Sequence, residues 1–207
     1  MNDDNIHLLG LIFANVGKEY LRITQSSLSD LGLHIQEMTP TRIIFSPWEI
    51  KNVSEEEYSL RGEIEWNPLT KDVLIKYIIW PKSSKRLPSF SRLLRWYLLK
   101  WNEEHSDSLQ GTVCRFLYPC KSNDQIILQA KSKVHLQVLR KRLRLILLKL
   151  DTIFKEEWET INMLLLGKCP EIIRNALMNE ITSVLLELEM NFDKYYEDKQ
   201  NEKGNSI

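Results

Sequence analysis

The chain has 207 residues and a formal net charge of zero at pH 7, with 28 basic and 28 acidic side chains. Its apolar content of 43% is sufficient for one sizeable core without structural staples. Its three cysteines, Cys114, Cys120 and Cys169, cannot all pair with one another, which argues against a disulfide scaffold. The longest early apolar run, residues 6–16, is well short of the roughly 20 residues that a membrane span needs, and no secretory leader precedes it. We therefore expect a cytoplasmic protein with no membrane partner.

The charged residues are distributed in three blocks. Residues 1–80 carry 7 Lys or Arg against 12 Asp or Glu, residues 81–150 carry 15 against 4, and residues 151–207 carry 6 against 12. The net charges are therefore −5, +11 and −6. A basic block of this size attracts phosphate, an acidic partner or the acidic ends of the same chain.

The first part of the chain predicts a helix followed by two hairpins. Apolar residues recur at helical spacing over residues 8–31 and stop at Gly32, so we expect one helix there, or two divided near Gly17. Residues 33–38 and 42–45 are expected to form two short strands joined by a turn. Residues 58–66 alternate between apolar and polar side chains, which is typical of a half-buried strand with an exposed charged face. A turn over residues 67–72 leads to a returning strand, residues 73–80, and then to a basic loop, residues 81–88.

The middle of the chain predicts a further helix and a third strand pair. Apolar residues at helical spacing, with Ser89 as the N-cap, indicate a helix over residues 89–104. Residues 110–118 and 125–130 then have the composition of two strands that flank a turn.

The longest segment without Pro or Gly, residues 133–166, predicts a helix with two apolar stripes on opposite sides. The wider stripe contains Leu136, Leu139, Leu143, Ile146, Leu147, Leu150 and Phe154, and the opposite one contains Val138, Leu145 and Leu148. We expect the sheet to cover one stripe and a last helix, residues 171–199, to cover the other, because Gly167 to Pro170 is a stop and restart signal. The polar tail, residues 200–207, is expected to be disordered.

These elements together predict an α+β fold: an antiparallel sheet of about five or six strands, packed by helices, with a C-terminal helical hairpin. The expected α+β domain spans residues 1–166. Residues 167–199 form an added C-terminal helix packed on the long helix of residues 133–166.

Several short patterns suggest a family. The residues that carry it are Leu31-Gly32-Leu33, Ile43-Ile44-Phe45, Leu93-Leu94, Leu98-Leu99, Trp101-Asn102, Gly111-Thr112-Val113-Cys114-Arg115-Phe116, Ile126-Ile127-Leu128-Gln129 and Asp151-Thr152-Ile153-Phe154. In these patterns, residues 5–160 resemble the YbjN-like proteins and the type III secretion chaperones whose α/β fold they share. The resemblance implies a non-enzymatic module that grips a partner segment, often as a dimer. The hairpin of residues 58–80 and the helix of residues 171–199 depart from that pattern.

The basic block and one tryptophan provide the candidate binding residues. Trp96 lies at the flank of its helical stripe among basic side chains, as a partly exposed anchor would. The candidate partner-binding residues are Lys82, Lys85, Arg86, Arg92, Arg95, Trp96, Arg140 and Arg144.

Three explanations of the basic block remain open. Its charge is neutralised within the chain by Glu156, Glu157, Glu159, Glu180, Glu187 and Glu189, or it binds an acidic protein partner, or it binds nucleic acid. The neutral total charge lacks the basic excess that is typical of nucleic-acid modules, which makes nucleic acid the weaker alternative.

No catalytic, metal-binding or nucleotide-binding motif is recognised. His105, Asp107 and Ser108 lie in one short connector, whereas working triads gather residues from separate elements. The four histidines have no zinc-ligand spacing, and the glycines form no phosphate-binding loop. We therefore expect no enzyme activity, no cofactor and no metal.

The expected function is that of a protein–protein interaction module, chaperone- or regulator-like, that binds a protein partner or self-associates as a homodimer. The alternative is a nucleic-acid-associated accessory factor that uses the basic segment, residues 82–149.

Overall fold

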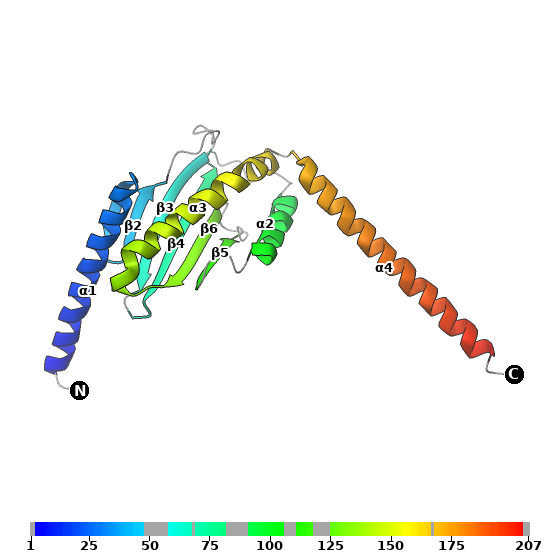
Figure 1. Cartoon of the computed structure of the whole chain (residues 1–207), viewed down its shortest axis with the longest axis horizontal. Helices are drawn as coiled ribbons and strands as arrows, with labels where there is room; N and C mark the ends of the chain where they lie inside the picture. Colours follow the sequence, from blue (N-terminus) through cyan, green and yellow to red (C-terminus); the bar gives the residue numbers. More distant parts are fainter. Residues whose placement is uncertain are drawn as a thin grey trace. The chain divides into compact units, whose positions relative to one another are not determined.

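The computed structural model describes residues 3–47, 58–67, 69–81, 91–105, 111–117, 125–166 and 168–204. The chain divides into two compact units, residues 1–166 and residues 167–207. Figure 1 shows the elements of both units, coloured along the sequence. Each unit is described by itself below.

The first unit contains a sheet and its helices. In chain order these are α1 (Asp3–Asp30), β1 (His34–Thr39), β2 (Arg42–Ser46), β3 (Tyr58–Asn67), β4 (Asp72–Pro81), α2 (Ser91–His105), β5 (Thr112–Leu117), β6 (Ile126–Lys133) and α3 (Leu136–Leu165). The second unit contains one described helix, α4 (Glu171–Gly204).

The six strands form one antiparallel sheet in the order β1-β2-β3-β4-β6-β5. Strand β4 lies between β3 and β6 and pairs with both of them. Ile75 of β4, for example, lies opposite Ile64 of β3 on one side and opposite Ala130 of β6 on the other. All three of these side chains are buried, which places them on the inner face of the sheet. The α+β class and the antiparallel sheet predicted from the sequence are confirmed.

The core lies between the inner face of the sheet and α3, which crosses that face while α1 and α2 lie alongside (Figure 1). The Phe154 ring of α3 lies 6.1 Å from the Tyr77 ring of β4 and is stacked on Trp158 at 5.5 Å. Helix α1 joins the same core through Tyr20, whose ring is stacked on Trp66 of β3 at 4.3 Å. Aromatic stacking of this kind adds to the apolar burial and holds the helices in place.

Several element boundaries differ from the sequence-based expectation. Helix α1 is continuous through Gly17, because a helix tolerates a single glycine at a modest cost when its flanking turns are packed. Strand β6 extends to Lys133, and α3 begins only at Leu136. Helix α4 continues to Gly204, so residues 200–204 are helical where a disordered tail was expected. The proposed N-cap Ser89 lies outside the described residues.

Helices α3 and α4 follow one another in the sequence across a short connector. The packing of α4 on α3 stays a prediction. Helix α4 carries apolar residues on all of its sides, and a single helix cannot bury such side chains by itself.

Tyr77 predicts how stability changes in alkali. Its side chain is fully buried, and burial raises the pKa of its phenol above the ordinary value of 10.0. Above that pH the unfolded chain releases a proton that the folded chain keeps, so the free energy of unfolding falls as pH rises. For each pH unit above 10, Tyr77 should lower the free energy of unfolding of the wild type by roughly 1.4 kcal/mol. The Tyr77→Phe variant should not show this part of the decrease.

Urea unfolding of the wild type and of Tyr77→Phe at pH 7 and pH 11 measures the difference. At pH 7 the substitution should be nearly neutral, because the Tyr77 hydroxyl has no hydrogen-bond partner in the described structure. An equal alkaline loss in both proteins would contradict the prediction.

Candidate protein-interaction surface

Helix α3 has one face on the sheet and a second face that points away from it. Its buried residues include Leu139, Leu143, Ile146 and Leu150, which follow helical spacing on the sheet side. Seven exposed residues lie on the opposite side at steps of three or four: Val138, Lys141, Leu145, Leu148, Thr152, Glu156 and Glu159. We call these seven residues the α3 outer stripe.

The first half of the α3 outer stripe is apolar and open to solvent. Val138, Leu145 and Leu148 are 54%, 45% and 41% exposed. These are the residues of the second apolar stripe predicted from the sequence. Neighbouring apolar side chains left open on one helix face are typical of a surface that binds a protein partner.

Two grooves flank this half of α3, and Lys141 lines both. The first groove, about 450 Å³, lies between the end of α1 and the start of α3 and is lined by Ser27, Asp30, Gln137, Arg140, Lys141 and Arg144. The second, about 460 Å³, is lined by Gly111, Lys133, Val134, Val138, Lys141, Arg142 and Leu145. The open apolar residues therefore lie between two sets of basic side chains. Such a surface suits an apolar segment that also carries negative charge.

Of the candidate residues predicted from the sequence, the structure brings Arg140 and Arg144 together in the first groove. Arg140 donates hydrogen bonds to Asp30 of α1 at 2.5 and 3.1 Å. This ion pair is mostly exposed, so it contributes little stability and mainly orients the guanidinium.

The other candidate residues lie elsewhere. Arg92 and Arg95 are exposed on α2, and Trp96 of the same helix is half-buried with the Lys100 ammonium 5.2 Å from its ring centre. Helix α2 contacts β5 at one edge of the sheet, whereas α1 contacts β1 at the other edge. The α2 residues and the first groove are therefore separate features. Lys82, Lys85 and Arg86 lie outside the described residues.

Internal neutralisation of the basic block is partly visible. Arg140 pairs with Asp30 at 2.5 Å, and Lys131 pairs with Asp72 at 3.7 Å. In the described part of the first unit, Glu156 and Glu159 form no ion pair with the basic residues of α3. One straight helix cannot bring its two ends together, so these charges remain apart.

Glu157 has a different role from the one considered in the sequence, because it joins α2 to α3. Its carboxylate accepts hydrogen bonds from the Tyr97 hydroxyl and from the Trp101 indole, the latter at 2.9 Å. Burial and this contact with a carboxylate raise the pKa of the Tyr97 phenol.

Asn102 of α2 attaches the helix to strand β5. Its side chain accepts a hydrogen bond from the Phe116 N–H at 2.7 Å and donates one to the Phe116 carbonyl oxygen at 2.8 Å. These contacts close the outer edge of β5 at that point.

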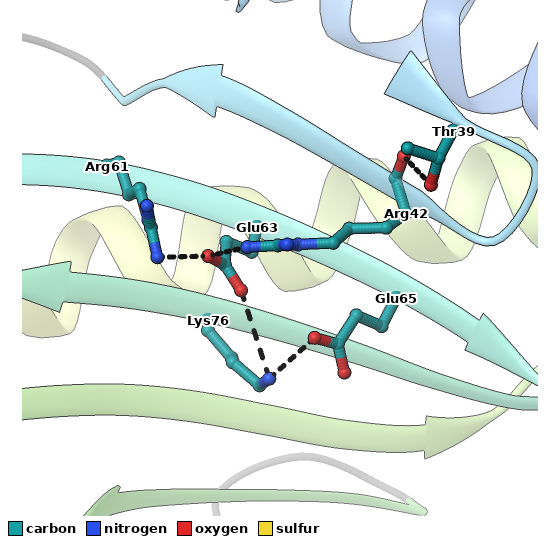
Figure 2. Close-up of polar contacts among 6 residues, drawn as sticks. All are labelled: Thr39, Arg42, Arg61, Glu63, Glu65 and Lys76. Carbon is teal, nitrogen blue, oxygen red and sulfur yellow. Dashed lines mark hydrogen bonds and ion pairs between the residues drawn. The ribbon is translucent and has the colours of Figure 1, made fainter. Parts of the chain in front are cut away.

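The opposite face of the sheet carries a charge cluster that sequence reasoning missed. Figure 2 shows the Glu63 carboxylate between Arg42 and Arg61, with Lys76 bridging Glu63 and Glu65. The expectation that Glu63 belongs to an exposed face is wrong, because its side chain is only 4% exposed. Arg42 belongs to β2, and it reaches Glu63 only because β2 pairs with β3 in this register. No short-range pattern in the sequence indicates that pairing.

Of the triad residues considered in the sequence, only His105 lies within the described residues. His105 is stacked on Trp101 at 4.5 Å, and its Nδ1 lies 2.9 Å from the Trp101 carbonyl oxygen. Asp107 and Ser108, the other residues of the triad considered above, lie outside the described residues. No three His, Cys, Asp or Glu side chains of the described segments are placed to hold a metal ion.

Among the described helices, none combines the length and the apolar character that crossing a membrane requires. Comparisons of the chain with protein-family models, with curated proteins and with solved structures find no match.

Proposed function

We propose that this chain is a non-enzymatic protein-interaction module, chaperone- or regulator-like, that binds an acidic and apolar protein segment on the α3 outer stripe. The observation that carries the proposal is the exposure of Val138, Leu145 and Leu148 between two basic grooves. Burying these side chains against a partner gives the affinity, and the surrounding lysines and arginines select for negative charge. The resemblance to YbjN-like proteins and type III secretion chaperones supports the same kind of function.

The proposed setting is the reducing cytoplasm. The chain has three cysteines, Cys114, Cys120 and Cys169, which cannot all pair with one another. Thiols kept in the reduced state are usual in that compartment.

The test is affinity capture with paired variants of the full chain. Leu145→Ser combined with Leu148→Ser removes the centre of the apolar surface, and Leu99→Ser, on α2, is a control with similar exposure of 48%. Removing interface anchors of this type weakens binding by roughly tenfold or more. We expect at least one protein that the wild type and Leu99→Ser retain from a lysate of the same organism, and that the double variant loses. Identical capture by all three proteins would refute the proposal.

The nucleic-acid alternative is tested by titration with a fluorescent oligonucleotide at two salt concentrations. Phosphate contacts give an affinity that falls steeply with salt. Steep salt dependence whose slope falls by about one unit in Arg144→Ala would favour the accessory-factor function, because Arg144 lines the first groove. The apolar residues at the centre of the surface favour the protein partner, since a phosphate backbone offers them no contact.

A further inference from the structure

The first groove beside α3 is lined by polar and charged side chains. Three cations, Arg140, Lys141 and Arg144, and one anion, Asp30, line it, so three positive charges less one negative charge give a formal charge of +2. The second groove differs, because three apolar residues line it beside its cations. The first groove therefore suits a small group of concentrated negative charge, and the second suits an apolar side chain.

Asp30 orients Arg140 and leaves it able to bind a second anion. The Nε and Nη2 atoms of Arg140 donate hydrogen bonds to one oxygen of Asp30, Oδ2, at 3.1 and 2.5 Å. A guanidinium has further N–H donors beyond these two. An oriented, planar guanidinium is well suited to phosphate, because it binds two oxygens of the group with parallel hydrogen bonds.

Lys141 and Arg144 supply charge that no described residue neutralises. Both side chains are exposed, and neither forms an ion pair within the described part of the chain. Gln137, Arg140, Lys141 and Arg144 follow one another at i, i+3, i+4 and i+7, so they lie on one face of α3. A single carboxylate would balance half of the +2 charge of the lining. A phosphomonoester, with about −1.5 to −2 at pH 7 and three acceptor oxygens, balances nearly all of it.

We infer that the first groove binds the phosphoryl group of a phosphorylated serine or threonine in the protein segment that binds the α3 outer stripe. The inference rests on the proposed function and names the source of the negative charge. Lys141 lines both grooves, and Leu145 of the second groove directly follows Arg144 of the first in the chain. A segment whose apolar side chains contact Leu145 therefore places a neighbouring phosphoryl group within reach of Arg144 and Arg140. Phosphorylation of the partner then strengthens its binding.

Three peptide mixtures test the source of the charge with the full chain. Each has a fixed central residue, phosphoserine, serine or glutamate, and the same mixture of leucine, aspartate and alanine at the flanking positions. Because the flanking side chains are the same, a difference in affinity reports the central group alone. We expect the phosphoserine mixture to bind at least about tenfold more tightly than the other two, since the phosphoryl group adds charge-assisted hydrogen bonds. Fluorescence anisotropy at one salt concentration measures each affinity.

Variants of the groove locate the phosphoryl group. Arg144→Ala and Lys141→Ala each remove one cation and should lower the preference for phosphoserine by about fivefold or more. Lys18→Ala removes an exposed cation of α1 outside the groove and should leave the preference unchanged. Leu145→Ser combined with Leu148→Ser should weaken the binding of all three mixtures and leave their ratio unchanged. Circular dichroism establishes that every variant is folded.

Three results would overturn the inference. The three mixtures could bind equally, or the preference for phosphoserine could survive in both groove variants. Free O-phosphoserine could also compete as strongly as the phosphoserine mixture, which would make the ligand a free phosphomonoester. If any of these occurs while the capture experiment above succeeds, the partner segment is not held by a phosphoryl group and the proposed function stands. If capture fails and the double variant binds the mixtures as the wild type does, the proposed function is wrong and the inference falls with it.

Discussion

Replacing Glu63 by alanine should lower the free energy of unfolding by about 2–3 kcal/mol. The Glu63 carboxylate lies 2.5 Å from Arg42, 2.7 Å from Arg61 and 3.9 Å from Lys76, and its own side chain is only 4% exposed. Removing one member of a buried charge network leaves the other members without compensation, which costs about 3–5 kcal/mol when the network is fully buried. We expect less here, because the three cations are 37%, 33% and 19% exposed and can turn partly towards water.

Two neighbouring substitutions provide the comparison in urea unfolding. Glu65→Ala removes a carboxylate that is 38% exposed and that contacts Lys76 at 2.8 Å, so it should cost no more than about 0.5 kcal/mol. Glu63→Gln keeps one side-chain oxygen as an acceptor and should fall between the two. If Glu63→Ala and Glu65→Ala cost the same, the cluster is not held together by its buried carboxylate.

Substituting alanine for Gly62 should destabilise the protein by roughly 2–3 kcal/mol through overpacking. Gly62 of β3 lies directly opposite Phe45 of β2, and a Cβ atom at this position would be 2.2 Å from the Cζ atom of the Phe45 ring. The ring cannot move aside easily, because Phe45 is fully buried and its centre lies 6.1 Å from the Tyr77 ring. The glycine is required here by close approach across the strand pair.

A double-mutant cycle with Phe45→Leu separates this cause from a general cost of alanine in a strand. Phe45→Leu alone leaves a cavity and should cost about 1–2 kcal/mol. In the double variant the smaller leucine gives room for the new methyl group. The double variant should therefore lose at least about 1 kcal/mol less unfolding free energy than the sum of the two single variants. Strict additivity of the unfolding free energies would show that the Phe45 ring does not restrict position 62.

The Gly62 prediction concerns the rigidity of the surface proposed to bind a partner. The Phe45 ring and the Tyr77 ring lie on the inner face of the sheet, where Phe154 of α3 contacts Tyr77. A sheet that packs well on this side holds α3 in place, and its exposed stripe then needs no reordering when a partner binds. The Glu157 contacts with Tyr97 and Trp101 position the other half of the same helix.

The secondary structure was largely predictable from local patterns. The alternation over residues 58–66 indicated β3, and the helical spacing from Leu93 to Trp101 indicated α2. The two stripes of the long helix were also predictable, including Val138, Leu145 and Leu148 as the side opposite the sheet. Each of these signals depends only on residues a few positions apart, because side-chain direction repeats with the period of a helix or a strand.

The environment of the polar residues was not predictable in the same way. Glu63 and Arg61 were expected on an exposed face, since both alternate with apolar residues in β3. The contact of Glu63 with Arg42 joins residues 21 positions apart in sequence, and the pair of Arg140 with Asp30 joins residues 110 positions apart. Strand order and helix placement create both contacts, and no periodicity in the sequence encodes them.

The sequence by itself therefore determined which segments of this protein are helices and strands, and that its long helix has two apolar sides, because these properties follow from short-range periodicity and turn chemistry. Only the tertiary structure decided that Glu63 is enclosed by three cations, that Arg140 and Arg144 share a groove with the end of α1, and that the sheet leaves Val138, Leu145 and Leu148 of α3 uncovered beside them. These features depend on which distant segments pack together. Burial and charge pairing are properties of that packing, since they arise only when water is excluded between elements.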